Sequence, residues 1–228
     1  MKTKLALTLL CIAVALPTFA QKKVDKRLSE STEVLRGNID KPDAIPKNIV
    51  DKAACVLVFP SVKKVGVGLG VSYGRGVLTC RKGAKMDGDW SAPAMYALDT
   101  GSLGVQLGGS STDYVMLVMS QKGADKVLSG KLKLGSDASA VAGPSGARAT
   151  GFNDPNADVV IYSRAQGGLF AGASLGTASL KADDDANKDL YGKSVDVQQI
   201  VRDGAVDVPP PAKPLIDLLD QASSKRAS

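Results

Sequence analysis

The stretch VGVGLGV, residues 65–71, alternates an aliphatic residue with glycine over seven positions. Because side chains alternate between the two faces of a β-strand, this pattern predicts a strand with one aliphatic face and one bare face. Glycine weakens strands, so a row of glycines indicates that another part of the chain packs very close to the bare face. The small-residue segment 134–149 is our candidate for that neighbour, and an open groove for an acyl chain or headgroup is the alternative.

The same alternation returns in SLGVQLGG, residues 102–109, and in GGLFAGASLG, residues 167–176. Three strands of this kind predict a curved, mainly antiparallel, Gly-rich β-sheet that is barrel-like or part of a sandwich. We expect a turn at PSVKK, residues 60–64, to separate the first strand from the glycine run. Segment 183–189, DDDANKD, predicts an acidic turn.

We predict helices near both ends of the chain and one in its middle, mainly from the helical spacing of apolar residues. The segments with this signal are residues 22–36, 46–53, 121–131 and 212–222. In residues 22–36 the apolar stripe consists of Val24, Leu28 and Leu35, and we expect it to dock on the rest of the domain. The sequence therefore predicts one α+β domain in which helices flank the sheet.

Composition permits a real core and excludes several kinds of chemistry. The chain has 228 residues, 44% of them hydrophobic and 4% aromatic, and it contains no histidine. Without histidine there is no Ser-His-Asp triad, Cys-His pair or His-based metal site. The glycine run fits neither the dinucleotide-binding nor the phosphate-binding loop. We therefore expect a protein that is not an enzyme, with no catalytic residues, cofactor, metal or nucleic-acid partner.

The first 20 residues have the pattern of a cleaved export signal. Lys2 and Lys4 precede the apolar run 5–16, and small residues stand at Thr18 and Ala20, where a signal peptidase needs them. The apolar run is shorter than the roughly 20 residues of a membrane span. The sequence thus predicts a signal peptide at 1–20, a mature domain at 21–228, and export of that domain.

Two cysteines, Cys55 and Cys80, lie in predicted strands on either side of the glycine run. In an exported protein they can form a lasting disulfide, and we assign them as a candidate pair. Two small buried thiols remain the alternative.

Basic residues supply the candidate binding site of a chain with a formal net charge of +6. Membrane-surface binding needs cations at the headgroups together with some apolar insertion. The candidate lipid-binding residues are Lys22, Lys23, Lys26, Arg27, Lys63, Lys64, Arg75, Arg81, Lys82, Arg164 and Phe170. For the lysines of the predicted turn the alternative is a solvated loop, and for Phe170 it is a place in the core.

Four motifs, in this order along the chain, resemble the SYLF domain, a lipid-binding module that is also described in yeast actin-patch proteins. They are FPSVKKVGVGLGVSYGRGVL, DWSAPAMYAL, GSDASAVAGPSGARA and YSRAQGGLFAGASL. The resemblance covers about residues 25–205, and the chain looks like a stand-alone member exported by a bacterium. It implies binding of anionic phospholipids, which are phosphoinositides in eukaryotic members, and actin binding in some members. It transfers no catalytic residue.

Taken with the charge pattern, the resemblance predicts non-catalytic binding of anionic phospholipids at the bacterial cell-envelope membrane. The protein would sit in the periplasm, peripheral on the outer or inner membrane. The alternative is an envelope protein-interaction or structural module that has a protein partner and no lipid specificity.

Overall fold

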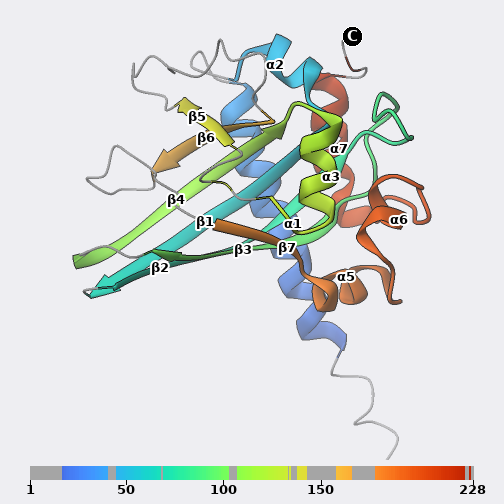
Figure 1. Cartoon of the computed structure of the whole chain (residues 1–228). Coiled ribbons are helices and arrows are strands. Elements are labelled where there is room, and N and C mark those ends of the chain that lie inside the picture. Colours follow the sequence, from blue (N-terminus) through green and yellow to red (C-terminus); the bar gives the residue numbers. More distant parts are fainter. Residues whose placement is uncertain are drawn as a thin grey trace, which may run out of the picture.

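Seven strands form one sheet in the order β5-β6-β4-β1-β2-β3-β7 (Figure 1). The computed structural model describes residues 17–40, 45–67, 69–102, 107–132, 134, 138–142, 158–165, 178–223 and 226. The strands are β1 (Cys55–Val67), β2 (Leu69–Cys80), β3 (Ala94–Ser102), β4 (Leu107–Val118), β5 (Ala138–Ala142), β6 (Val159–Ala165) and β7 (Ala178–Ala182). All neighbours are antiparallel except β5 and β6, which run parallel.

Helices flank this sheet at both ends of the chain, so the predicted α+β class is confirmed. They are α1 (Pro17–Ile39), α2 (Lys47–Lys52), α3 (Gln121–Leu128), α5 (Asp184–Tyr191), α6 (Val197–Val201), the 3₁₀ turn η1 (Pro210–Ala212) and α7 (Lys213–Ala222). Within the described residues the sheet is a single open layer, because β5 and β7 at its two ends do not pair with each other. The expected closure into a barrel or sandwich is therefore absent from this part of the chain.

The stretch 65–71 is the tip of a hairpin and not one straight strand. β1 ends at Val67 and β2 begins at Leu69, and the register pairs Val67 with Leu69, Gly66 with Gly70 and Val65 with Val71. Our single-strand prediction was wrong because the alternation is symmetric about its centre. Folding it back pairs aliphatic residues with each other and glycines with each other, so the period-two pattern is kept on both strands.

The predicted turn at PSVKK is also wrong, because β1 runs straight through it with a β-bulge. The register against β2 shifts between Val58 and Lys63, and Ser61 has a φ of 49°. The Ser61 backbone N–H donates to Asp113 Oδ1 at 2.7 Å. A bulge is one of the few places where a sheet tolerates a proline such as Pro60, and it mimics a turn in the sequence.

The bulge explains two glycines of β2. An added Cβ at Gly76 would lie 2.1 Å from the carbonyl O of Val58 and 2.6 Å from Cδ1 of Phe59. An added Cβ at Gly74 would lie 2.7 Å from Cγ2 of Val62. The close neighbour of these glycines is thus β1 itself. The described part of segment 134–149 that forms a strand, β5, lies instead at the edge of the sheet beside β6.

Helices lie on both sides of the sheet (Figure 1), and a hydrophobic layer lies on each of its faces. We call the face that carries Val56, Val58, Val77, Val115 and Leu117 the α1 face, because α1, α2, α5 and α7 pack there. We call the opposite face, covered by α3 and α6, the α3 face. The predicted stripe of α1 docks on its face as expected, with Val24 2%, Leu28 0% and Leu35 1% exposed.

The acidic segment 183–189 is a helix rather than a turn. Asp183 is the N-cap of α5, and its side chain accepts a hydrogen bond from the Ala186 backbone N–H. Acidic residues are favourable at a helix N-terminus, which explains why three consecutive aspartates can begin a helix. Asn187, one turn along, is buried and exchanges hydrogen bonds with the Met95 backbone, which fastens α5 to β3.

Cys55 and Cys80 lie directly opposite each other on β1 and β2 and form a disulfide with an S–S distance of 2.08 Å. Both residues are fully buried. Of the two alternatives left open by the sequence, the structure contains the disulfide.

Asp158 fastens the start of α3 and gives the fold an acid-sensitive contact. Its Oδ1 accepts from Ser120 Oγ at 2.6 Å, and its Oδ2 lies 3.1 Å from Lys126 Nζ. Hydrogen bonding to Ser120 and then to Lys126 lowers the pKa of Asp158 below its usual 3.8, against the opposing effect of burial. Its contribution to stability is therefore present above the unfolded-state pKa and is lost as the pH falls through the folded-state pKa.

We expect Asp158→Asn to lower the free energy of unfolding by about 1 kcal/mol at pH 7. Thermal unfolding of variant and wild type should then give different midpoints at pH 7, and the midpoints should converge as the pH falls below 3.8 and through the lowered folded-state pKa. A difference of the same size above and below that pKa would contradict this role of the carboxylate.

Candidate functional site

A stripe of exposed side chains runs along β2 toward the tip of the hairpin. Val71 is 51% exposed and Tyr73 is 52% exposed, and these are the exposed large hydrophobic side chains among the residues that the structure describes. Arg75 follows at the same spacing and its side chain is 50% exposed. Because alternate residues of a strand share a face, all three belong to the α1 face, beyond the part that α1 covers. We call Val71, Tyr73 and Arg75 the β2 stripe.

Charged side chains flank the β2 stripe on the neighbouring strands. The register places Lys63 of β1 and Asp99 of β3 on either side of Tyr73. Lys63 Nζ donates to Ser111 Oγ at 3.2 Å, and Arg75 Nη1 lies 3.6 Å from Asp99 Oδ1. The hairpin therefore presents an aliphatic residue and an aromatic ring with cations close to them.

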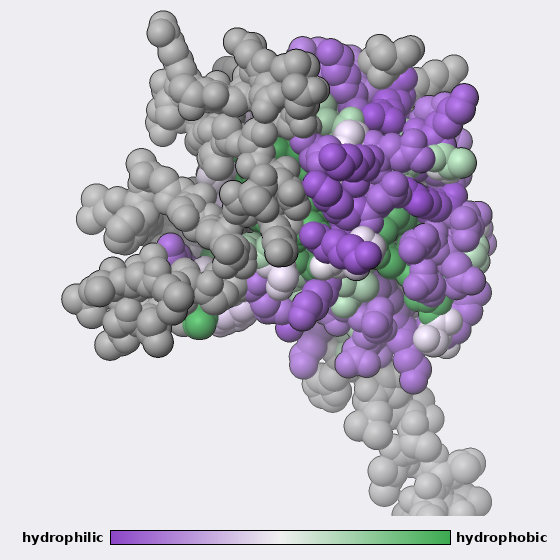
Figure 2. All heavy atoms as spheres, in the orientation of Figure 1, coloured by the Kyte–Doolittle hydropathy of each residue, from purple (hydrophilic) through white to green (hydrophobic). Residues whose placement is uncertain are grey.

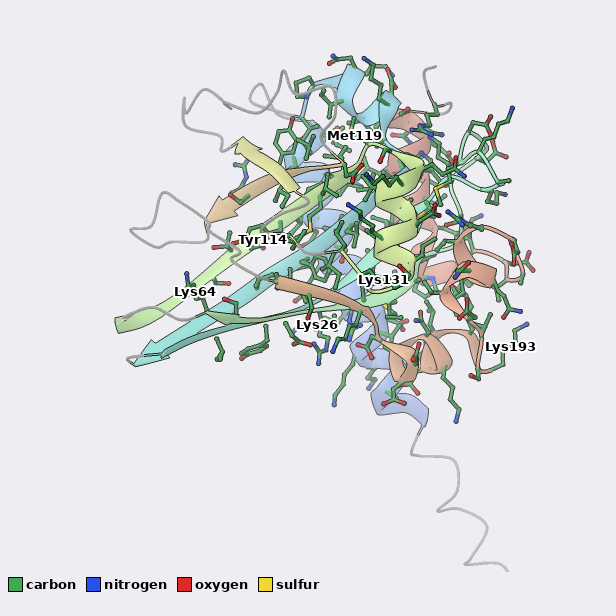
Figure 3. All side chains as sticks on the ribbon, viewed as in Figure 1. Lys26, Lys64, Tyr114, Met119, Lys131 and Lys193 are labelled. Carbon is green, nitrogen blue, oxygen red and sulfur yellow. A yellow bond between two sulfur atoms is a disulfide. The ribbon has the colours of Figure 1, made fainter. Side chains whose placement is uncertain are left out.

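The fold brings together two of the residues predicted from the sequence. Lys63 and Arg75 lie on the same face of the β1–β2 hairpin, because Lys63 pairs with Tyr73, whereas Lys64 pairs with Ser72 and belongs to the opposite face. Figure 3 shows Lys64 toward the free end of the strands, with Lys193 on the opposite side of the molecule. Lys63 is exposed and adds a hydrated charge to the stripe, and Lys64, which is half-buried, does not join it.

The basic start of α1 forms a separate group that acidic residues partly offset. Lys22, Lys23 and Lys26 are exposed. Arg27, however, forms an ion pair with Asp183 at 2.9 Å, and α1 packs against α5, whose first turn carries Asp184 and Asp185. This arrangement weakens the positive field that the sequence alone suggests for residues 22–27.

Two further candidates lie away from the hairpin tip. Lys82, which is half-buried, follows the other end of β2, and Arg164 of β6 donates to the Gly37 carbonyl O of α1 at 3.4 Å. Neither of these two residues joins the β2 stripe. The remaining candidate, Phe170, lies outside the described residues.

Arg81 is buried and has a structural role. Its exposure is 0%, its guanidinium lies 4.2 Å from the centre of the Trp90 ring, and its Nη2 donates to the Ser223 carbonyl O at 2.9 Å. Trp90 Nε1 donates to the same carbonyl, which fastens the segment after α7 to the sheet. Burial lowers the pKa of Arg81. We therefore leave Arg81 out of the candidate surface.

Sequence reasoning missed Val71, Tyr73, Asp99 and Asp183 as members of the site. The alternation V-S-Y-G-R-G, residues 71–76, was the available signal, since it puts large residues on one face and small ones on the other. It was hidden because the preceding glycines were assigned to the same strand. Asp99 and Asp183 join the site only through strand pairing and helix packing, which the sequence does not display.

We also searched the described residues for a metal site and for a membrane-spanning helix. Among the residues that the structure describes, no group of three or more His, Cys, Asp or Glu side chains could hold a metal ion. None of the helices described is long and apolar enough to cross a bilayer. Figure 2 shows a mostly hydrophilic face over α3, α5 and α6.

The protein is an α+β domain with an exposed stripe of side chains on its β1–β2 hairpin. The chain belongs to the Ysc84 family, whose model, described as "Las17-binding protein actin regulator", matches residues 99–222. This confirms the SYLF-domain resemblance found in the sequence motifs.

The curated relatives described next are eukaryotic proteins that are longer than this chain. It is 31% identical to "Protein YSC84" of Saccharomyces cerevisiae over 77% of this chain and 37% of that protein. It is 32% identical to "SH3 domain-containing protein PJ696.02" of Schizosaccharomyces pombe over 87% of this chain and 46% of that protein. It is 28% identical to human "SH3 domain-containing YSC84-like protein 1" over 90% of this chain and 58% of that protein. The chain thus spans less than half the length of the two yeast proteins.

Proposed function

We propose that this chain is a non-catalytic module that binds anionic phospholipid at a cell-envelope membrane through the β2 stripe. The observation that carries the proposal is the pair of exposed apolar residues, Val71 and Tyr73, with Lys63 and Arg75 on the same face beside them. Tyrosine suits a membrane interface because its ring is apolar and its hydroxyl is polar. Each cation held near an anionic surface adds about 1 kcal/mol of attraction.

Export to a periplasm, after cleavage of residues 1–20, is part of this proposal. The Cys55–Cys80 disulfide supports it, because such bonds persist in oxidising compartments. On this view the hairpin meets phosphatidylglycerol or cardiolipin on the inner or outer membrane. The basic residues of α1 would add a weaker second contact, since acidic residues lie close to them.

Vesicle flotation of the purified protein tests the proposal directly. We expect binding to vesicles that contain phosphatidylglycerol or cardiolipin, weaker binding at high salt, and little binding to phosphatidylcholine vesicles. Lys63→Glu changes two charge units at the stripe, so it should lower affinity for anionic vesicles by about 2 kcal/mol, or roughly 30-fold. Absence of binding to all vesicles would overturn the proposal.

The matched control for Lys63→Glu is Lys193→Glu. Lys193 is exposed and lies far from Lys64 in Figure 3, and its reversal changes the net charge equally. We expect it to leave vesicle binding within about twofold of wild type, since salt screens charges more than about 10 Å away. Equal losses in both variants would mean that net charge, and not the stripe, governs binding.

Protein binding is the second candidate function. The family description names binding to the protein Las17, which makes a protein partner plausible for a member of the same family. The β2 stripe also fits this role, because exposed tyrosine and arginine are common at protein interfaces. Photo-crosslinking from residue 73 in cells separates the two candidates: lipid adducts support the membrane proposal, and a discrete protein adduct supports this one.

A further inference from the structure

Arg75 belongs to a chain of alternating charges that joins three elements to the β2 stripe. Asp183, the N-cap of α5, lies 2.9 Å from Arg27 of α1 and 3.6 Å from Arg75 of β2. Arg75 in turn lies 3.6 Å from Asp99 of β3. One arginine of this chain is therefore next to Tyr73, at the surface that we propose for membrane binding.

The contacts in this chain differ in strength. The Arg27–Asp183 pair is short, and its side chains are only 15% and 18% exposed. Both ion pairs of Arg75 exceed hydrogen-bond length, and Arg75 and Asp99 are 50% and 53% exposed. Exposed ion pairs at such distances contribute little, so Arg75 is the member that can leave its partners at small cost. Asp183 keeps Arg27 when this happens.

We propose that Arg75 is the phosphate-binding residue of the stripe, and that Asp99 is the competing carboxylate that sets its affinity. The inference rests on the proposed membrane function and deepens it. The ligand is the phosphate group of a membrane lipid, and binding exchanges the pair with Asp99 for a pair with that phosphate. The planar guanidinium can donate two parallel hydrogen bonds to phosphate oxygens, a geometry that its present 3.6 Å contacts do not reach.

Vesicle binding of Asp99→Asn tests this exchange. Removing the competing carboxylate should raise affinity for phosphatidylglycerol vesicles about three- to fivefold over wild type. The charge-matched control is Asp87→Asn, because Asp87 is exposed on the loop 82–90 that follows the other end of β2. We expect the control to change affinity by less than about 1.5-fold, owing to screening over that distance.

A second substitution asks whether the guanidinium itself holds the phosphate. Arg75→Lys keeps the charge but loses the planar pair of donors, so adding it to Asp99→Asn should abolish the gain. Thermal unfolding should show that all variants are folded, since the Asp99 contact with Ser179 uses the backbone carbonyl and survives the change. Asp99→Ser replaces Asp99→Asn if that variant does not fold.

The outcomes separate this inference from the proposed function. The role of Arg75 and Asp99 would be overturned if Asp99→Asn and Asp87→Asn raised affinity equally, or if the gain survived Arg75→Lys. In both cases binding of the wild type to anionic vesicles would still support the membrane proposal. If neither wild type nor Asp99→Asn binds anionic vesicles, the proposed function itself fails.

Discussion

Gly76→Ala should be among the most destabilising single substitutions in this chain. The new Cβ would lie 2.1 Å from the Val58 carbonyl O and 2.6 Å from the Phe59 ring, and one of these two contacts is to backbone, which cannot rotate away. Overpacking of this kind costs about 3 kcal/mol. In a protein of this size such a loss lowers the midpoint of thermal unfolding by about 6–12 °C.

The same substitution at Gly37 provides the control. Gly37 lies in α1, and an added Cβ there has no atom within 4 Å. Alanine is the better helix former, so Gly37→Ala should raise stability by up to about 1 kcal/mol. Gly76→Ala unfolding at the same temperature as wild type would show that the bulge of β1 does not press on β2 as the structure has it.

The glycines of β2 show where sequence reasoning succeeded and where it stopped. The close neighbour was predicted for the glycines of residues 65–71, whereas the structure shows a very close neighbour at Gly74 and Gly76, further along β2. The identity of the neighbour could not be predicted, because the Ser61 backbone N–H in the bulge donates a hydrogen bond to Asp113, which is 52 positions away. The proline and the two lysines around Ser61 suggest a turn locally, and tertiary pairing overrides that suggestion.

Helices were easier to predict than the site. The stripe of α1 was visible from the spacing of Val24, Leu28 and Leu35, because helix periodicity is a local property. The charged site was predicted only in part. Lys63 and Arg75 lie on one face of neighbouring strands because the hairpin reverses between Val67 and Leu69. Arg81, six positions beyond Arg75 on β2's side of the turn, stacks on a buried tryptophan instead. The position of an arginine along the sequence therefore does not predict whether it is exposed or buried. Its burial depends on which elements pack against that end of the strand.

Loss of the Cys55–Cys80 disulfide is the second change for which we expect a large effect. The bond links residues 25 positions apart, so the chain-entropy model gives a stabilisation of about 3.5 kcal/mol. The double variant Cys55→Ala/Cys80→Ala should therefore unfold about 7–14 °C below wild type. This hairpin is the central pair of the sheet, so the loss should appear in global unfolding and not merely at the tip.

Reductant distinguishes the missing bond from the missing side-chain volume. Tris(carboxyethyl)phosphine should lower the unfolding midpoint of wild type toward that of the double variant and leave the variant unchanged. Because both sulfurs are fully buried, reduction should be slow in the folded protein and fast near the unfolding transition.

Alkylation of unreduced, denatured protein followed by mass spectrometry must find residues 55 and 80 unmodified. Two alkylated thiols at these positions would remove the disulfide from the fold and, with it, the structural argument for an oxidising compartment.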